Sequence, residues 1–312
     1  MSDVRGVPAT VTVVIPTRGR PRLVVRAVRS ALDQTCPPHE VVVVVDGRDP
    51  ATEQALAGLD PRVVVVPLAS SGGAAAARNA GVARATGDLI AFLDDDDLWL
   101  PAKLQRQWAV LAAATDPWNT VVSTAAFWDT GDGATVWPTR SPRPGEPIAE
   151  YLFVRDHAGE GLLATPTILL PRTLAAAHPM DPTMRIHEDL DWFLRLEAAG
   201  ASFVVLPQPL VRVDASSGRQ SLSSQSTWSE SLAWSVEHRA RLGPRAFSGF
   251  VLTEAGRAAV RSDAPLGTRT AILRCAMGGR PRPRDVARYL ALNAAPSRLR
   301  SWVHARRLGS TS

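Results

Sequence analysis

Short, wholly apolar runs separated by amphipathic stretches dominate residues 10–125 of this 312-residue chain. Continuous apolar runs of this length are typical of strands buried on both faces, as in a parallel sheet covered by helices. The strand candidates, of which the second and third are nearly pure valine, are Thr10–Ile15, Val41–Val45, Val63–Val66, Leu89–Leu93 and Thr120–Thr124. This pattern restricts the fold more than any other feature of the sequence.

The stretches between these runs have helical patterns. Pro21–Gln34 opens with proline at a plausible first-turn position and gathers apolar side chains on one face. Ala74–Ala85 is rich in alanine, the strongest helix former. Strands that alternate with helices predict an α/β fold with a Rossmann-like, doubly wound and mainly parallel sheet.

After residue 125 the pattern is less regular. Glu188–Ala199 has a helical pattern, and Ser202–Leu206 and Leu210–Val213 are further strand candidates. Residues 216–238 contain a Ser-rich loop and the start of a helical region, and residues 239–312 form a basic, helical C-terminal extension.

Charge is divided unevenly along the chain. Residues 1–238 hold 20 Lys+Arg and 27 Asp+Glu, a net charge of −7, whereas residues 239–312 hold 15 Arg and 3 acids, a net charge of +12. Arginines among the apolar residues of Pro283–Asn293 and Ser297–Leu308 suit an anionic membrane surface. The alternative is helices packed on the rest of the protein with solvated arginines. Nucleic acid is disfavoured as a partner because no recognised binding module accompanies the charge.

Four consecutive carboxylates, Asp94 to Asp97, directly follow the apolar run Leu89–Leu93. Charge runs are usually solvated surface. Here, however, they lie at the carboxyl end of a buried strand, where open α/β sheets bind ligands. Crowded carboxylates repel one another, and a hard divalent ion such as Mg²⁺ or Mn²⁺ relieves that repulsion.

Other polar residues are expected at the same sheet edge. Asp46 ends the valine run and precedes glycine, so it either forms a turn or accepts a hydrogen bond from a nucleobase N–H. Pro16, Thr17 and Arg18 end the first run and supply backbone groups and a hydroxyl there. Arg78 either pairs with acids on a surface helix or reaches a diphosphate or the acid run.

Three segments, VTVVIPTRGRP, VVVVVDG and GGAAAARNAGVARATGDLIAFLDDDDLWLPAKL, resemble the nucleotide-binding half of family 2 glycosyltransferases, which have the GT-A fold. The resemblance implies a GT-A domain over residues 1–215. Its nucleotide-sugar-binding half covers 10–115 and its acceptor and base half covers 116–215.

The resemblance also implies roles for these residues. Asp46 holds the nucleobase, with Pro16, Thr17 and Arg18 beside it, and Arg78 lies near the diphosphate or the metal-site acids. Asp94 and Asp96 match the D-x-D motif, in which Asp96 is a metal ligand and Asp94 lies near ribose or metal. The roles of Asp95 and Asp97 stay open, because four consecutive acids blur the register, and Asp95 is kept among the donor-binding candidates.

His187-Glu188-Asp189-Leu190-Asp191-Trp192 opens the later helical stretch. As bare sequence, acids at a helix start are commonly caps or dipole partners. The segment also resembles the "ED" element of these transferases, which implies that Asp189 is the catalytic base, with Glu188 as the second candidate. Because a helix N-terminus favours a charged carboxylate, we expect Asp189 to be ionised at neutral pH.

The implied reaction is metal-dependent, inverting transfer of a sugar from a nucleotide-diphosphate sugar, with UDP as the favoured nucleotide. The acceptor stays open among a carbohydrate, a lipid-linked glycan and a small molecule. Two alternatives are a sugar-phosphate nucleotidyltransferase and a catalytically silent nucleotide-sugar-binding protein. No apolar run reaches the 18 or so residues needed to span a bilayer. The expected location is therefore cytoplasmic, with peripheral contact at the inner membrane surface as an option.

Overall fold

The computed structural model describes residues 9–129, 133–215 and 227–294. It divides into two compact units. Unit 1 comprises Met1–Trp128, Val136–Ser141 and Leu163–Asp214, and unit 2 comprises Asp129–Thr135, Pro142–Leu162 and Ala215–Ser312. The predicted boundary near residue 215 coincides with the end of unit 1. The two earlier segments of unit 2, which interrupt unit 1, were not expected from the sequence.

The framework of unit 1 is a nine-stranded sheet. Its strand order is β3-β2-β1-β4-β8-β6-β9-β5, with β7 paired to β6. The first four strands of this order pair in parallel, and β8 and β5 pair antiparallel with their neighbours β4 and β9. The strands are β1 (Val11–Thr17), β2 (Glu40–Val45), β3 (Val63–Pro67), β4 (Leu89–Phe92), β5 (Leu98–Trp99), β6 (Thr120–Asp129), β7 (Ala134–Trp137), β8 (Leu169–Pro171) and β9 (Ser202–Asp214).

The predicted apolar runs form the centre of this sheet. All residues of β2 and β4 are buried, because helices cover both faces. The prediction of a doubly wound α/β domain is confirmed, and its parallel part has the topology β3-β2-β1-β4. Two predicted strands, Ser202–Leu206 and Leu210–Val213, form the single strand β9.

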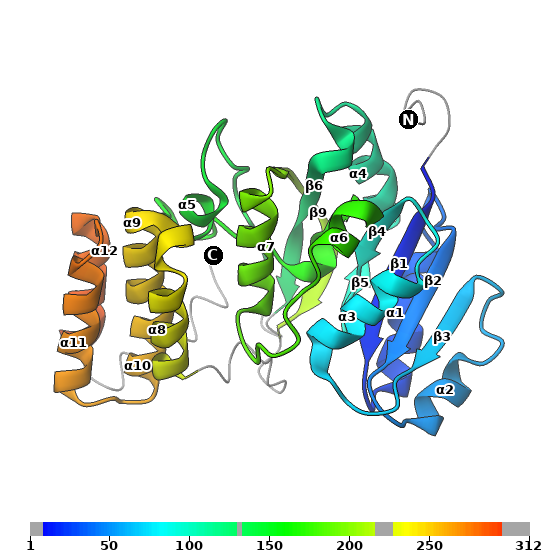
Figure 1. Cartoon of the computed structure of the whole chain (residues 1–312), viewed down its shortest axis with the longest axis horizontal. Coiled ribbons are helices and arrows are strands. Elements are labelled where there is room, and N and C mark those ends of the chain that lie inside the picture. The colour runs from blue at the N-terminus through cyan, green and yellow to red at the C-terminus, as the bar shows by residue number, and fades with distance from the viewer. Residues whose placement is uncertain (1–8, 130–132, 216–226, 295–312) are drawn as a thin grey trace. The chain divides into compact units, whose positions relative to one another are not determined.

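The helices of unit 1 are α1 (Pro21–Leu32), α2 (Pro50–Leu56), α3 (Gly73–Arg84), α4 (Lys103–Ala112), α6 (Arg172–Ala177) and α7 (Glu188–Ala198), with 3₁₀ turns at Pro117–Asn119 and Thr165–Thr167. In Figure 1, α3 and α6 lie side by side on one face of the sheet. α3 packs closely against β1, since a Cβ on Gly81 would lie 2.3 Å from Cγ1 of Val14. This contact fixes the helix that carries Arg78 against the central strand.

Unit 2 is helical. It contains α5 (Ile148–Phe153), α8 (Trp228–Glu237), α9 (Arg239–Phe250), a π-helical turn (Val251–Ala255), α10 (Gly256–Arg261), α11 (Leu266–Met277) and α12 (Pro283–Ala294). Phe250 joins the elements, with ring centroids 5.0 Å from Phe153 of α5 and 4.9 Å from Trp234 of α8. Figure 1 shows α8 to α12 packed as a bundle, which agrees with the predicted helical C-terminal extension.

Two predicted segments lie outside the described residues, namely residues 216–226 of the Ser-rich loop and, in the basic extension, the helix Ser297–Leu308. The other predicted basic helix is α12. Its Tyr289 is buried, and the Tyr289 hydroxyl donates to the carbonyl of Arg269, 2.9 Å away. In the described ranges, no helix has the length and apolarity to cross a bilayer.

Candidate active site

Polar side chains converge where the parallel strands of unit 1 end. Thr17 is the last residue of β1, Asp46 directly follows β2, and Asp94 lies two residues beyond β4. Because these strands run in parallel, their carboxyl ends meet at one edge of the sheet, the usual place for ligands in such folds. The structure therefore brings the polar residues predicted for β1, β2 and β4 to a common edge.

A pocket of about 360 Å³ opens between the loops after β1, β2 and β3. Its volume falls within the range of about 300–1,000 Å³ that is common for small-molecule sites. The pocket is lined by Arg18, Gly19, Asp46, Gly47, Arg48, Asp49, Ser70 and Ser71. Arg18 spans two of the loops, since its Nη1 donates to the hydroxyl of Ser71, 2.9 Å away.

Asp46 is held firmly in this pocket. Its carboxylate accepts hydrogen bonds from the Ser71 hydroxyl (2.7 Å) and from the amides of Gly72 (2.7 Å) and Gly73 (3.1 Å). A carboxylate has about four acceptor positions, so one remains for a further donor such as a nucleobase N–H. The predicted role of Asp46 therefore fits its surroundings, and so does the alternative that it only shapes the loop.

The four aspartates after β4 have four different surroundings. Asp94 pairs with Arg78 (2.6 Å), Asp95 accepts from the Thr17 hydroxyl (2.7 Å), and Asp97 accepts from the backbone amide of Asp214 (3.2 Å). Asp95 and Asp97 are buried, whereas Asp94 and Asp96 are partly exposed. The exposed pair is the one that matches D-x-D. Thr17 is committed to Asp95, and Pro16, the residue before it, stays part of β1.

The two buried aspartates have raised pKa values. Burial is the largest cause for Asp95, where Thr17 and Arg20 act in the opposite direction. The pKa of Asp97 is raised well above its usual range by burial and by the charges of Asp94 and Asp96. Asp97 is thus easier to protonate than an ordinary aspartate, and its protonation would reduce the repulsion within the run.

The exposed carboxylates fit one kind of metal site. In the part of the chain that the structure describes, no three His, Cys, Asp or Glu side chains form a cage for a metal ion. Mg²⁺, however, is usually held by one or two carboxylates, with water and substrate phosphates completing its shell. Asp94 and Asp96 supply hard oxygen donors of that kind.

Arg20 was missed by sequence reasoning. Its Nη1 lies between two carboxylates, 2.9 Å from Oδ1 of Asp95 and 3.0 Å from Oδ2 of Asp96. Arg20 directly precedes α1 and so belongs to the loop after β1, at the same sheet edge as the acids. That position, next to the predicted Pro16-Thr17-Arg18 segment, was the signal available in the sequence.

Arg78 connects the acid run with the start of α7. Its Nη2 lies 2.6 Å from Oδ1 of Asp94, and its Nη1 lies 3.8 Å from Oε1 of Glu188. Only 7% of its side chain is exposed. Its Nε is buried and has no hydrogen-bond partner among the described residues. The guanidinium is therefore the link between the predicted donor edge and the predicted base.

Asp189 lies in the first turn of α7, where its Oδ1 accepts from the backbone amide of Leu190, 2.8 Å away. Loss of solvent and the charge of Glu188 raise its pKa to about 7, although Arg78 acts in the opposite direction. The helix N-terminus was expected to favour the carboxylate form of Asp189, whereas loss of solvent and the charge of Glu188 act against that form. Near neutral pH the carboxyl is poised between its two forms.

Asn79 fixes the segment that leads to α7. Its side-chain amide donates to the carbonyl of Met180 (2.7 Å) and accepts from the amide of the same residue (2.9 Å). These reciprocal hydrogen bonds tie α3 to the chain between α6 and α7. The neighbours Arg78 and Asn79 thus set the position of α7 relative to the sheet edge, one by charge and one by hydrogen bonds.

Four tryptophans of unit 1 have different environments. Trp99 is buried, with its indole N–H on the carbonyl of Pro166 (2.9 Å) and the Lys103 ammonium 3.9 Å from its ring, so it is a core residue. Trp128 and Trp137 form an edge-to-face pair with centroids 6.0 Å apart. Trp118 is the exposed member of the set.

Comparison with known proteins gives a family match and curated relatives. The model of Glycosyl transferase family 2 matches residues 12–158. The amylovoran biosynthesis glycosyltransferase AmsB of Erwinia amylovora is 31% identical over 209 residues, which cover 64% of this chain and 67% of AmsB. The succinoglycan biosynthesis protein ExoU of Rhizobium meliloti is 29% identical over 211 residues, which cover 64% of this chain and 60% of ExoU.

A solved structure, S. aureus TarS 1-349 in complex with UDP-GlcNAc, superposes with a TM-score of 0.55 at 17% sequence identity. The match covers 85% of this chain and 70% of that one. At this identity the likeness concerns the fold alone, and it confirms the predicted GT-A architecture with C-terminal helices. The family match and the AmsB alignment together show that this chain belongs to family 2 of the glycosyl transferases.

Proposed function

We propose that this glycosyltransferase moves a sugar from a nucleotide-diphosphate sugar to an acceptor hydroxyl in one inverting displacement, with Asp189 as the general base. The observation that carries the proposal is Arg78. Its buried guanidinium contacts Asp94 on one side and Glu188, the neighbour of Asp189, on the other. One donor-side carboxylate and the neighbour of the candidate base therefore contact the same cation within unit 1.

Asp189 has the acid–base properties that the role requires. A general base works best when its pKa lies near the operating pH, and the pKa of Asp189 is raised to about 7. Its deprotonated carboxylate would take the proton from the acceptor hydroxyl as the oxygen attacks the anomeric carbon. The displacement requires a single carboxylate as base, unlike glycoside hydrolysis, which typically uses a pair.

The sheet-edge pocket is the proposed nucleotide site. Asp46 would accept the N–H of a pyrimidine base with its remaining acceptor position, with Arg18 and Ser71 beside it. UDP is the favoured nucleotide because the TarS structure of the same fold was solved with UDP-GlcNAc. Thr17, the residue before Arg18, is buried and donates a hydrogen bond to the buried Asp95, which joins the end of β1 to the acid run beside this site.

Asp96 and Asp94 are the residues that would hold a divalent cation. Bound Mg²⁺ or Mn²⁺ would neutralise negative charge on the diphosphate of the donor. Arg78 would assist from within the protein, since a buried guanidinium stays protonated at any working pH and costs no reorganisation.

A saccharide is the proposed acceptor. AmsB and ExoU are named for the biosynthesis of amylovoran and of succinoglycan. We propose by analogy that this enzyme adds a sugar to a growing glycan, free or lipid-linked.

The test is a panel of nucleotide sugars with Mn²⁺, scored for donor binding and for transfer by the wild type and by Asp189→Asn. The variant should bind donor as the wild type does and lose transfer by a factor of about 10² or more, the usual contribution of a general base. Asp116→Asn is the matched control, because Asp116 is exposed in the same unit. Normal turnover by Asp189→Asn would remove Asp189 from the mechanism. Donor binding without transfer by the wild type would favour the silent binding protein.

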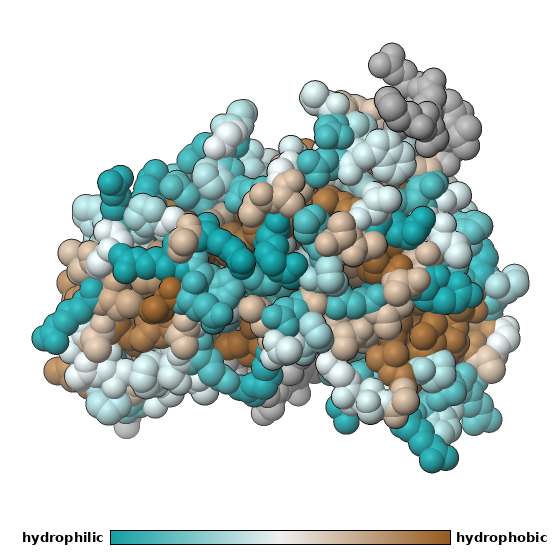
Figure 2. Space-filling view, in the orientation of Figure 1, coloured by the Kyte–Doolittle hydropathy of each residue, from teal (hydrophilic) through white to brown (hydrophobic). Residues whose placement is uncertain are grey.

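Contact with an anionic membrane on the cytoplasmic side is a separate proposal for the basic C-terminal part. On the face shown in Figure 2, apolar side chains over the helices of unit 2 are interspersed with hydrophilic ones. Exposed apolar residues of unit 2 include Leu266, Met277 and Leu290. Truncation after Ala294 removes four arginines and leaves α12 whole, so it should reduce co-sedimentation with anionic liposomes. Undiminished co-sedimentation would exclude residues 295–312 as the contact.

A further inference from the structure

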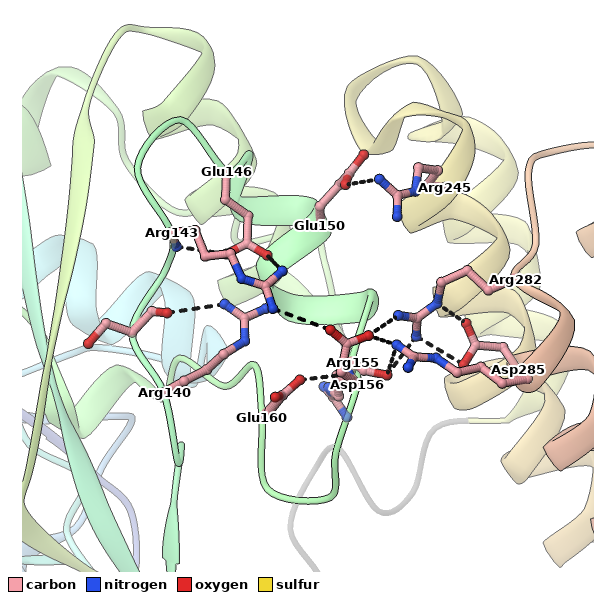
Figure 3. Close-up of polar contacts among 12 residues, drawn as sticks. Arg140, Arg143, Glu146, Glu150, Arg155, Asp156, Glu160, Arg245, Arg282 and Asp285 are labelled. Atoms are coloured by element: carbon pink, nitrogen blue, oxygen red, sulfur yellow. Dashed lines mark hydrogen bonds and ion pairs between the residues drawn. The ribbon is translucent and has the colours of Figure 1, made fainter.

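A second pocket, of about 290 Å³, lies within unit 2. Its wall is formed by the Pro-rich segment before α5, by α5 itself, by α9 and by the segment before α12. The charged residues that line it are Arg143, Glu146, Glu150, Asp156, Arg245 and Arg282. Figure 3 shows these side chains gathered around the end of α5. None of them has a role in the proposed transfer reaction.

The floor of the pocket is fixed by Arg282. Its guanidinium donates to both oxygens of Asp285 (2.6 and 3.0 Å), to Asp156 (2.8 Å) and to the carbonyl of Arg155 (2.6 Å). Only 15% of this side chain is exposed. Asp156 is anchored as well, since its amide donates to Glu160, 2.6 Å away. These contacts hold the positive and negative groups at the floor of the pocket in fixed positions.

The rim arginines are held more loosely. Arg143 and Arg245 are 61% and 50% exposed. Arg143 lies 3.3 Å from Asp156 and 4.0 Å from Glu146, and Arg245 lies 3.2 Å from Glu150. A guanidinium carries five N–H donors, so both retain donors for a ligand. Exposed ion pairs of this kind contribute little, so exchanging them for a ligand costs little.

The backbone around the pocket is stiff. Pro144 and Pro147 flank a turn in which Gly145 has a φ of +72°. α5 is then clamped to α9, because the Phe153 and Phe250 rings pack edge to face and a Cβ on Gly249 would lie 2.2 Å from the Phe153 carbonyl oxygen. A site with little freedom of its own loses little entropy when a ligand binds.

The lining selects a particular ligand chemistry. Three guanidinium groups and three carboxylates line the pocket, so it carries no net charge and offers a dense polyanion such as nucleic acid no net attraction. A ligand with one acidic group and several hydroxyls can bond to both the arginines and the carboxylates of the lining. Its carboxylate would pair with the rim arginines, and its hydroxyls would donate to the protein carboxylates.

We propose that this pocket binds a saccharide that bears a carboxylate, such as a uronic acid residue of a glycan. The identification of that saccharide as part of the acceptor rests on the proposed function, whereas the binding itself does not. Arg143 and Arg245 are the residues that recognise the carboxylate.

The full chain is titrated without donor against trigalacturonate, against the neutral trisaccharide maltotriose and against inorganic phosphate, by calorimetry or by ligand-observed NMR. We expect saturable binding of trigalacturonate and none of comparable strength for the other two. Arg143→Gln and Arg245→Gln should each weaken this binding about tenfold, the usual loss for a hydrogen bond to a charged group. Arg261→Gln removes an exposed arginine of the same unit away from the pocket and should have no effect.

Three results would overturn the proposal. They are equal binding of the charged and neutral trisaccharides, phosphate binding as tight as that of trigalacturonate, and equal weakening by Arg261→Gln. Donor hydrolysis by the same samples separates this inference from the proposed function. Saccharide binding without donor turnover would leave the pocket in place and remove the transferase proposal. Donor turnover without saccharide binding would leave the transferase proposal in place and remove the saccharide site.

Discussion

At the scale of single residues, four identical side chains in a row have four different sets of partners. Asp95 and Asp97 are buried with raised pKa values, while Asp94 and Asp96 stay partly exposed beside Arg78 and Arg20. Spacing alone left the register of this run open. Burial distinguishes its members, and burial depends on Thr17 and Asp214, which lie far away in the sequence.

If Asp96 holds a divalent cation as proposed, Arg20 competes with that cation for its carboxylate. Because its guanidinium lies 3.0 Å from Asp96, removing it should strengthen Mn²⁺ binding several-fold in the absence of donor. The measurement is a Mn²⁺ titration of Arg20→Gln followed by electron paramagnetic resonance. Arg22→Gln, an exposed position of α1, is the control. Weaker Mn²⁺ binding by Arg20→Gln would show that Arg20 organises the site instead of competing for it.

Arg78 should set the pH at which the base becomes active. Its positive charge lowers the pKa of Asp189, so Arg78→Gln removes a stabilisation of the carboxylate and moves that pKa further above 7. The rising limb of kcat/KM against pH should therefore move upward by about one unit. Activity at pH 7 should fall and partly recover at higher pH.

Arg78→Lys is the matched control for this shift, since lysine keeps the charge and loses the guanidinium geometry. Its pH midpoint should stay near that of the wild type even if the overall rate falls. A midpoint that is unchanged in Arg78→Gln would mean that Asp189 is not the group whose titration limits the rate.

At the scale of elements, continuous apolar runs were reliable. β1, β2, β3 and β4 begin and end within two residues of the predicted ranges, because strands buried on both faces must be apolar throughout. β5, β7 and β8 were missed, since strands of two to four residues are too short to show a period. Residues of β9 were divided into two strands because Pro207 and Gln208 interrupt the apolar pattern of a strand that is only partly buried.

Gly81 shows how closely one helix approaches the sheet. A Cβ at this position would lie 2.3 Å from Cγ1 of Val14, so Gly81→Ala should force α3 away from β1 and destabilise the protein by about 1–3 kcal/mol. Urea unfolding measures the loss. Gly267→Ala in α11, where a Cβ meets open space, should be neutral or slightly stabilising. Equal stability of the two variants would contradict the close packing.

At the scale of the whole molecule, the boundaries of the two compact units differ from the point where the composition of the chain changes. The composition changes near residue 239, but residues 142–162 already belong to unit 2. The contacts that recruit them, such as Phe153 with Phe250, join residues about a hundred positions apart. Local periodicity contains no information about such pairs, so the predicted domain of residues 1–215 omitted α9, the helix on which α5 packs.

A truncated protein of residues 1–215 should therefore fold poorly. It leaves the buried Ile148, Tyr151, Leu152 and Phe153 of α5 without the helices of unit 2. We expect strong binding of an apolar dye and loss of cooperative unfolding relative to a truncation after Ala294, which keeps every described helix. Cooperative unfolding of the shorter protein would show that residues 142–162 can be accommodated by unit 1.

The position of Arg78 between Asp94 and Glu188 has a thermodynamic consequence. One cation cannot fully neutralise two partners, so any anion that draws Arg78 toward Asp94 and the donor edge leaves Asp189 with a higher proton affinity. Linkage is reciprocal, and a proton on Asp189 must then strengthen the binding of that anion by the same factor. A bound donor that draws Arg78 away would thus raise the pKa of Asp189, so transfer with donor bound would require a higher pH than titration of Asp189 in the free protein indicates. Departure of the diphosphate would favour release of the proton just taken.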